Sequence, residues 1–535
     1  MLKVILSDRA YIAGGGSVPG NVSENDVYPL VKAFYPEETV KVYSEEESPA
    51  IGDSSGEERR HPGCHGEENE HSVSRVPGEV FRPGAGIDLI KICFWSGEIG
   101  ISLTGKNGGC LEEHQPVPEG LSKAEYKNSM KRFLYRMLSK ETGRSLPWGI
   151  LTGIRPTKLV YEMLKQGETE HGIYEQMRRE YLCTDGKIAR SLEIAGREMV
   201  LLDALEYQRG YSIYIGIPFC PSTCLYCSFP SYSVTKYAGT VEKYLEALEK
   251  EISAFADAFP ERELQTVYLG GGTPTTLDAE QLDRLLGRVK EFYDFSGVRE
   301  FCVEAGRPDS ITPEKLKVLK KWGVNRISIN PQSMSQKTLD LIGRKHTVEQ
   351  VEEAFLLARE AGHDNINMDI IIGLPGEDPE DVANTLRRIR ELNPDSLTVH
   401  TLAVKRAARL NLEKEAYSDC PAVQVSRMLE QTEEYAKKNG YVPYYLYRQK
   451  NMADNLENVG YARPGREGIY NILIMEEKQT ILAFGAGGMS KFIFPEENRL
   501  ERVDNVKSIT DYIGRIDELI EKKKNFIEEN RSKLS

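Results

Sequence analysis

Three cysteines on one short segment carry the clearest chemical signal in this sequence. Cys220, Cys224 and Cys227 are spaced C-x3-C-x2-C within YIGIPFCPSTCLYCSF. Thiolates are soft ligands that suit iron–sulfur clusters, and a cluster of four irons normally takes about four of them. Three ligands leave one iron open, and an open position lets a metal centre bind and activate another molecule. The spacing therefore predicts a catalytic rather than a structural cluster.

A zinc site and a disulfide fit the same cysteines less well. Zinc sites usually space cysteines in C-x2-C pairs and complete the shell with a second pair or with histidines, and neither follows here. A disulfide is disfavoured because the number is odd and because residues 1–12 lack the apolar core and cleavage site of a signal peptide. The remaining cysteines are scattered and are predicted to be buried or inert thiols, namely Cys64, Cys93, Cys110, Cys183, Cys302 and Cys420.

Length and composition limit the class of protein. A chain of 535 residues is too long for one ordinary core, which predicts two or three domains. The net charge of −13 argues against a general nucleic-acid surface, because phosphate binding needs clustered lysine and arginine. No run of the sequence is apolar and long enough to span a bilayer. We therefore expect a cytoplasmic protein, without nucleic-acid or membrane partners, in a compartment that keeps thiols reduced.

Short apolar runs alternate regularly with amphipathic segments from residue 211 onward. The runs predict strands at 212–217, 266–269, 300–304, 325–329, 365–372 and 396–400. The segments between them predict helices at 241–258, 279–294, 313–322, 348–361 and 379–392. Alternating strands and helices form a parallel sheet with the helices outside. The fold class is therefore predicted as α/β, with an open, partial (β/α)6 barrel over 211–405 whose site lies at the C-terminal ends of its strands.

The rest of the chain is predicted to form three further regions. Residues 1–145 predict a mixed α+β domain, with a strand over 91–103 and a flexible polar insertion at 45–82. Residues 146–210 predict a helical connector. Residues 406–535 predict a mainly helical C-terminal extension, which we expect to cover the substrate.

Glycines and polar side chains follow several of the predicted strands. The run GGGTPT after the second strand would let a ligand approach backbone N–H and C=O groups directly, which favours a cradle for the amino-acid part of a cofactor. Glu304 ends the third strand, where its carboxylate could accept an ammonium group. Gln332, Arg344 and Asp369 lie in or after the fourth and fifth strands. A salt bridge or a helix cap would explain any one carboxylate, but their recurrence at successive strand ends favours a binding site.

The ordered motifs resemble those of a known family. Y-x-x-I-P-F-C-x3-C-x-Y-C, G-G-G-T-P-T, R-x-S-x-x-x-Q-S and D-x-I-x-G-L-P-G occur in this order within residues 211–491. They look like the motifs of radical S-adenosylmethionine proteins of the oxygen-independent coproporphyrinogen III dehydrogenase family. The segments YRQKNMADNLENVGY and LTGIRPTKL are similar to its HemZ-type branch in particular.

The resemblance implies a cluster, two cofactor molecules and the residues that bind them. Cys220, Cys224 and Cys227 would hold a 4Fe-4S cluster, and the amine and carboxylate of S-adenosylmethionine would chelate its open iron. The residues implied for this first cofactor molecule are Tyr214, Gly271, Glu304 and Ala403. Those implied for a second S-adenosylmethionine are Tyr226, Gly272, Thr273, Gln332, Arg344 and Asp369. The backbone of Met489 would close the pocket.

The resemblance also implies an activity and leaves alternatives open. The expected reaction is the oxidative decarboxylation of coproporphyrinogen III to protoporphyrinogen IX in heme biosynthesis, through a 5′-deoxyadenosyl radical and with an electron donor such as flavodoxin or ferredoxin. Gly216, Phe229 and Asn330 depart from the dehydrogenases, which have His, Cys and usually Gly at these positions. Relatives without that further cysteine include heme chaperones, and a radical methyltransferase would use the same binding residues.

A tetrapyrrole substrate would need cationic side chains in the pocket. Its carboxylates need cations that match planar oxygens, for which arginine is well suited. The candidates are Lys405, Arg406, Arg409, Arg448 and Lys450, although a solvated basic face would explain any one of them equally well. Tyr444, Tyr445 and Tyr447 are predicted either to stack on the macrocycle or to pack in the core.

Overall fold

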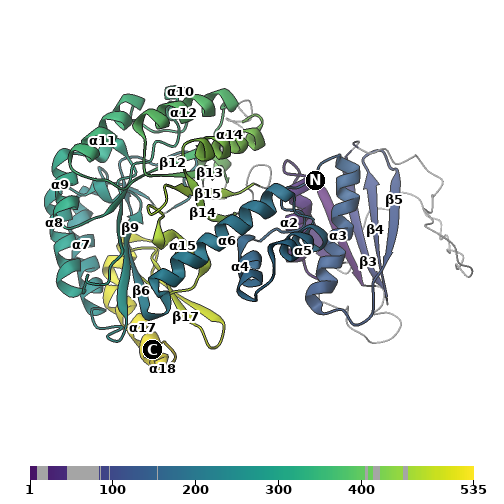
Figure 1. Cartoon of the computed structure of the whole chain (residues 1–535), viewed down its shortest axis with the longest axis horizontal. Helices are drawn as coiled ribbons and strands as arrows, with labels where there is room; N and C mark the ends of the chain where they lie inside the picture. Colours follow the sequence, from purple (N-terminus) through teal and green to yellow (C-terminus); the bar gives the residue numbers. More distant parts are fainter. Residues whose placement is uncertain are drawn as a thin grey trace, which may run out of the picture. The chain divides into compact units, whose positions relative to one another are not determined.

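The chain forms two compact units (Figure 1). The computed structural model describes residues 1–8, 22–44, 84, 86–95, 97–153, 155–229, 231–403, 408–413, 422–449 and 456–534. The first unit comprises Met1–Gly153 and Glu170–Ala189, and the second comprises Ile154–Thr169 and Arg190–Ser535. The region 146–210, predicted as a connector, is thus divided between the two units. The predicted insertion at 45–82 lies outside the described residues.

The first unit contains a five-stranded sheet with the strand order β2-β1-β3-β4-β5. Its strands are β1 (Leu2–Asp8), β2 (Val40–Ser44), β3 (Ile87–Trp95), β4 (Glu98–Gly105) and β5 (Cys110–Pro116). The pairs β1–β2 and β1–β3 are parallel, and β4 and β5 continue the sheet in antiparallel pairs. The segment 91–103, predicted as one strand, is a hairpin instead, because Gly97 turns the chain between β3 and β4 with a φ of 80°.

Two helices of the first unit, α2 (Glu24–Phe34) and α3 (Lys123–Thr142), bury one apolar face against this sheet. A further helix, α5 (Glu170–Tyr181), contacts α3. Val31 of α2 and Leu134 of α3 lie in the same buried cluster as Ile92 of β3. Helix α3 begins at a capping box, in which the Ser122 hydroxyl accepts from the N–H of Glu125 and the Glu125 carboxylate accepts from the N–H of Ser122.

The second unit contains an eleven-stranded sheet with a parallel centre. Six strands lie side by side in chain order and pair in parallel, namely β6 (Gly210–Ile217), β9 (Glu263–Gly271), β10 (Glu300–Glu304), β11 (Arg326–Ser328), β12 (Ile366–Ile372) and β13 (Ser396–Thr401). The helices that cover them in Figure 1 include α7 (Ala238–Ala254), α8 (Ala279–Phe292), α9 (Pro313–Lys321), α11 (Val348–Glu360) and α12 (Pro379–Leu392). The predicted α/β fold with six β/α units is confirmed.

Side-chain caps fix where these outer helices begin. Asp278 accepts a hydrogen bond from the N–H of Gln281 at the start of α8, and Asp378 caps α12 in the same way. Thr312 and Thr347 cap α9 and α11. Such a cap stabilises a helix by about 1 kcal/mol. The caps of α8, α9 and α12 follow a strand end closely, so these loops are short and lie at one edge of the sheet, whereas α10 (Gln336–Leu341) lies between β11 and the cap of α11.

The region after residue 405 adds strands to both edges of the sheet, beside the predicted helices. On one side, β15 (Asn458–Ala462) pairs antiparallel with β13, and β14 (Val442–Tyr447) follows it. On the other side, β16 (Ile481–Phe484) pairs parallel with β6, and β17 (Met489–Phe494) and β18 (Arg499–Asp504) follow. β15 and β16 are buried along their whole length, so their conformation depends on their neighbours in the sheet.

Helices complete the second unit. Those of the C-terminal region are α13 (Arg409–Leu412), α14 (Val425–Lys438), α15 (Ile469–Glu476), α16 (Ile509–Gly514), α17 (Ile516–Glu529) and α18 (Arg531–Leu534). The others are α4 (Thr157–Lys165), α10 (Gln336–Leu341) and the part of α6 (Asp185–Leu205) from Arg190 onward. Within the part of the chain that the structure describes, no helix combines the length and the apolar character needed to cross a bilayer.

A buried ion pair ties α17 to α7. Lys523 Nζ donates to Glu251 Oε1 at 2.7 Å and to the carbonyl oxygen of Ala483 at 2.7 Å. The same carboxylate accepts three further hydrogen bonds, from the hydroxyl of Tyr512, the side-chain amide of Asn505 and the N–H of Gly485. Gly485 packs directly on the end of β6, where a Cβ would lie 2.5 Å from the carbonyl oxygen of Gly216. The ion pair thus fixes the loop after β16 against the strand that leads to the cysteines.

Candidate active site

The predicted site residues meet in one cavity of about 350 Å³ at the C-terminal ends of the parallel strands. The predicted residues that line it are Cys220, Cys224, Tyr226, Cys227, Gly271, Gly272, Thr273, Glu304, Gln332, Arg344, Asp369 and Ala403. Of the residues predicted to contact the cluster or the cofactors, Tyr214 and Met489 are absent from the described lining. The structure therefore brings together residues from all six central strands and the loops after them, up to 183 residues apart between Cys220 and Ala403.

Backbone hydrogen bonds hold the cysteine loop in place. The short strands β7 (Phe219–Cys220) and β8 (Tyr232–Ser233) pair across its base. Within the loop, the N–H of Leu225 donates to the carbonyl oxygen of Ile342 at 2.9 Å, and the carbonyl oxygen of Leu225 accepts from the N–H of Leu410 at 2.9 Å. Leu225 is buried, so the loop is anchored between its first and last cysteine ligands.

The three thiols provide a donor set that fits an iron–sulfur cluster. All three line the same cavity, and burial raises the pKa of the Cys220 thiol to about 11. Thiols of this kind bind metal as thiolates, so cluster binding would release their protons. Among the described residues, no three His, Cys, Asp or Glu side chains are grouped as a single metal ion requires. Cysteines that hold a cubane each bind a different iron, so they need not converge on one point.

The glycine loop packs against the cysteine loop. The N–H of Gly272 donates to the carbonyl oxygen of Ile217 at 2.8 Å, and the N–H of Thr273 donates to that of Phe219 at 2.7 Å. A Cβ on Gly272 would lie 2.6 Å from the carbonyl oxygen of Phe219. The predicted approach of a ligand to free backbone N–H groups is therefore wrong for these two groups, because the chain's own cysteine loop occupies them.

Glu304 is the last residue of β10, and tyrosine side chains pack beside it. The hydroxyl of Tyr268 donates to its carboxylate. The Tyr268 ring stacks on that of Tyr214 at 6.2 Å and on that of Tyr470 at 4.5 Å. Tyr214 thus supports the wall of the site and contacts the glycine loop, since a Cβ on Gly271 would lie 3.1 Å from its hydroxyl. Burial raises the pKa of Glu304 to about 7, although the hydrogen bond from Tyr268 lowers it.

Several buried polar atoms of the cavity wall have no hydrogen-bond partner among the described residues. They are Asn330 Oδ1, Gln332 Oε1 and Arg344 Nε. Gln332 also has a φ of 67°, a conformation that non-glycine residues rarely adopt. Backbone hydrogen bonds to the carbonyl oxygen of Asp369 and from the N–H of Ile371 hold it there. Unsatisfied buried polar groups cost about 1–3 kcal/mol each, so their gathering at one wall indicates a polar ligand.

Asp369 forms a second charged element of the cavity. Its carboxylate lies 3.6 Å from Nε2 of His400, and Nδ1 of His400 lies 3.4 Å from the hydroxyl of Tyr447. Burial raises the pKa of Asp369, but the hydrogen bond and charge of His400, with hydrogen bonds from Asn367 and Thr398, hold it below its usual value. His400 belongs to none of the sequence motifs, although it ends the sixth predicted strand.

The residues predicted to bind the substrate lie in different environments. Tyr447 lines the cavity, whereas Tyr444 and Tyr445 are buried in the core. Arg448 is 3% exposed and donates from Nε to the carbonyl oxygen of Leu456. Arg409 forms a bidentate ion pair with Glu413 on the surface of α13. Three further candidates, Lys405, Arg406 and Lys450, lie outside the described residues.

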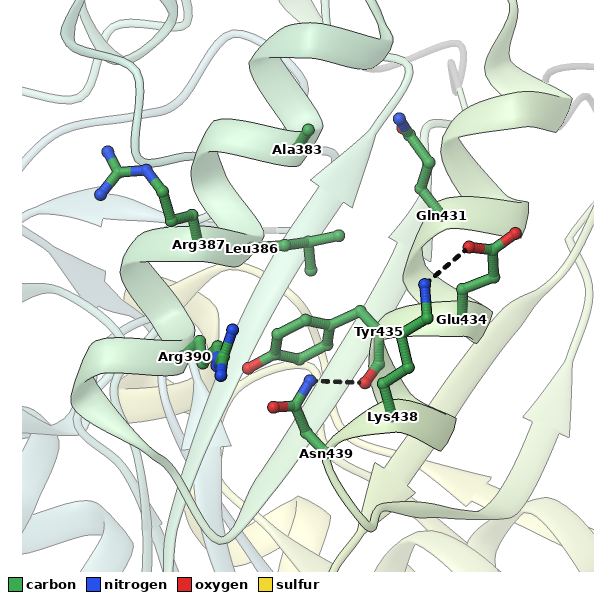
Figure 2. Close-up of a pocket in the computed structure, with 9 residues that line it drawn as sticks. All are labelled: Ala383, Leu386, Arg387, Arg390, Gln431, Glu434, Tyr435, Lys438 and Asn439. Atoms are coloured by element: carbon green, nitrogen blue, oxygen red, sulfur yellow. Dashed lines mark hydrogen bonds and ion pairs between the residues drawn. The ribbon is translucent and has the colours of Figure 1, made fainter.

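A second cavity, of about 510 Å³, lies between α12 and α14 (Figure 2). Tyr435 of α14 projects across it toward Arg390 of α12 in Figure 2. Lys438 on its wall forms an ion pair with Glu434 at 3.3 Å. Its described lining contains none of the predicted site residues. The chemistry therefore points to the smaller cavity at the strand ends.

Comparisons with known proteins agree with this site. The family model of the Radical SAM superfamily matches residues 214–389, which contain the second half of β6, the cysteine loop and the four strands β9 to β12. The oxygen-independent coproporphyrinogen-III oxidase-like protein HemZ of Bacillus subtilis is 43% identical over 433 residues, which cover 79% of this chain and 86% of that protein. The heme chaperone HemW of the same organism is 33% identical over 52% of this chain and 69% of that protein.

One solved structure is also similar. The coproporphyrinogen III oxidase HemN of Escherichia coli aligns with a TM-score of 0.47 and 26% identity, over 60% of this chain and 72% of that one. Membership of the Radical SAM superfamily implies a 4Fe-4S cluster and S-adenosylmethionine, for which the gathered thiols and unsatisfied polar atoms are suited. This chain belongs to the oxygen-independent coproporphyrinogen-III oxidase-like family of radical S-adenosylmethionine proteins.

Proposed function

We propose that this protein catalyses the oxygen-independent oxidative decarboxylation of coproporphyrinogen III to protoporphyrinogen IX. The observation that carries the proposal is the single cavity that combines three thiols, a glycine loop and a wall of unsatisfied polar atoms. The relatives indicate the substrate class, since HemZ of Bacillus subtilis is a coproporphyrinogen-III oxidase-like protein and a 34% identical relative from Escherichia coli is an oxygen-independent coproporphyrinogen III oxidase.

The proposed reaction converts a propionate side chain into a vinyl group. The substrate loses one hydrogen atom from the carbon next to the pyrrole ring. The bond to the carboxylate then breaks, carbon dioxide leaves, and one electron passes to a one-electron acceptor. The bound cluster and S-adenosylmethionine supply the chemistry that removes the hydrogen atom, with an electron from a donor such as flavodoxin or ferredoxin. Two such conversions give the product.

The chain's own residues bind and orient the reactants. Cys220, Cys224 and Cys227 would hold the cluster, and Glu304 would accept a hydrogen bond from the amino group of the cofactor that the cluster binds. Gln332, Arg344 and Asp369 contact a second cofactor molecule across the polar wall. Tyr447 and His400, on the side of the cavity formed by β13 and β14, face the tetrapyrrole.

An anaerobic product assay tests this proposal. Reconstituted protein, reduced and supplied with S-adenosylmethionine and coproporphyrinogen III, is expected to release carbon dioxide and form protoporphyrinogen IX. Mass spectrometry of the porphyrin products and of the cofactor fragments provides the measurement. Cofactor cleavage without any vinyl product would reject the substrate, and a methylated product would favour a methyltransferase instead.

Heme transfer is the second candidate function. Two observations favour it: the 33% identity with HemW, and the 64% exposed Phe229 at the position where the dehydrogenases have a further cysteine. An aromatic side chain beside the cysteine loop could stack on a flat macrocycle. Stoichiometric heme binding, transfer to an apo-hemoprotein and the absence of vinyl products would support this function over the first.

Cofactor affinity is expected to depend on pH through Glu304. The pKa of about 7 means that this carboxylate gains a proton as the pH falls through 7 and then accepts a hydrogen bond from the cofactor's amino group less strongly. Asp369, whose pKa is lowered, stays charged in this range. Equilibrium dialysis with S-adenosylmethionine between pH 6 and 8 should show tighter binding at the higher pH.

The variant Glu304→Gln provides the control for this prediction. It should bind the cofactor about tenfold to a hundredfold more weakly at pH 8, because a charged hydrogen bond contributes about 1.5–3 kcal/mol. Its affinity should be nearly constant between pH 6 and 8. A wild-type affinity without pH dependence, or a variant that retains it, would contradict the role of Glu304.

A further inference from the structure

The guanidinium group of Arg307 lies against one of the cysteine thiols. Arg307 follows β10 in the segment VEAGRPDSIT and is 3% exposed. Its Nη1 lies 3.7 Å from Sγ of Cys224, within the distance of an N–H···S hydrogen bond, and it lines the same cavity. Neither the motifs nor the resemblance assigned this residue a role.

A fixed set of partners holds the guanidinium group in this position. Asp309 accepts from Nε at 3.0 Å and from Nη2 at 2.9 Å. The hydroxyl oxygen of Ser222, inside the cysteine loop, accepts from Nη1 and Nη2 at 3.2 Å each. The carbonyl oxygen of Ser222 accepts from Nη1 at 3.3 Å. Because Asp309 and the cysteine loop both hold the guanidinium group, it is oriented before any ligand binds.

The charged side chains around Cys224 carry a net positive charge. Arg307 is paired with the single carboxylate of Asp309. Arg344 lies on the other side and donates from Nη2 to the hydroxyl of Tyr226 at 3.2 Å. His346 is fully buried 4.0 Å from Asp309, and burial, then Arg344 and Arg307, lower its pKa to about 3, so it stays neutral. Two arginines and one aspartate therefore act on this thiolate.

We propose that Arg307 raises the reduction potential of the cluster by donating to the Cys224 thiolate, an inference that rests on the cluster in the proposed function. On reduction the cluster gains one electron from the donor protein, and no covalent bond forms or breaks at Arg307. The reduced cluster carries one more negative charge, which a nearby cation and an N–H···S bond stabilise. Arg307 acts through the ligand and is a positioning residue.

Opposite changes of charge at the same place provide the test. Arg307→Gln removes the positive charge and should lower the midpoint potential. At a fixed solution potential, the ratio of reduced to oxidised cluster should fall about tenfold, which corresponds to about 59 mV for one electron. Asp309→Asn removes the neighbouring negative charge and should move the potential the other way. Arg307→Lys keeps the charge and should stay within about threefold of the wild type.

Redox titration followed by electron paramagnetic resonance, on protein reconstituted without S-adenosylmethionine, measures these shifts. Shifts of opposite sign in R307Q and D309N support the proposal, because general damage to the fold would not move the two in opposite directions. An unchanged potential in R307Q, or shifts of equal sign, would overturn it. If R307Q fails to retain iron, an unchanged or lower potential in D309N overturns it. A wild-type protein that holds no cluster refutes the proposed function itself.

Discussion

Replacing Cys220, Cys224 or Cys227 by alanine is expected to abolish cofactor cleavage and turnover. Each thiolate binds one iron, and two remaining ligands cannot retain the cluster. We expect the activity to fall by at least about a thousandfold, since no other group described in the cavity supplies one-electron chemistry. The measurements are iron and sulfide content after anaerobic reconstitution and the rate of S-adenosylmethionine cleavage.

Cys110→Ser serves as the matched control for the cysteine variants. Cys110 is an exposed free thiol on β5 of the first unit and belongs to no cavity described above. Its replacement should leave iron content and turnover at the wild-type level. A Cys224→Ala protein that keeps its iron and its rate would refute the assignment of the cluster.

Lys523→Met is expected to destabilise the second unit by about 3–5 kcal/mol, because it leaves the buried carboxylate of Glu251 without its cation. Both side chains are at most 1% exposed. Since Glu251 also accepts from the N–H of Gly485, the loop beside β6 should loosen as well. Guanidinium denaturation followed by circular dichroism should show a lower transition midpoint.

Two further variants show whether the loss of stability depends on burial or would follow the loss of an exposed ion pair as well. Lys250 and Asp517 pair on the same two helices, but their side chains are 52% and 79% exposed. Lys250→Ala should therefore cost less than about 1 kcal/mol. The double variant Glu251→Gln with Lys523→Met should recover part of the lost stability, because the unpaired charge is gone. Equal costs for K523M and K250A would contradict the role of burial.

The parallel core could be predicted from the sequence because its strands and helices carry their own signals. β10 (Glu300–Glu304) and α12 (Pro379–Leu392) have the predicted bounds, since apolar runs and N-cap residues mark them. β14 begins with Val442 and Pro443, and β16 has four residues. Such short or proline-containing strands acquire their conformation from the neighbours with which they pair, which no local pattern reveals.

The site could be predicted as far as its residues belong to motifs at strand ends. The carboxyl ends of parallel strands meet at one edge, so the cysteines, Glu304 and Asp369 were expected together. Arg307 and His400 were missed because their importance depends on contacts across the fold. Arg307 approaches Cys224 over 83 residues of sequence. Arg448, whose charge indicates a substrate contact, is buried and absent from the described cavity lining.

The central claim is that three thiolates hold a cluster whose open iron binds S-adenosylmethionine. Electron paramagnetic resonance of the reduced, anaerobically reconstituted wild-type protein, recorded with and without the cofactor, tests it most directly. The account predicts the signal of a reduced 4Fe-4S cluster whose g values change when S-adenosylmethionine is added. A protein without such a signal, or a signal that the cofactor leaves unchanged, would contradict the account.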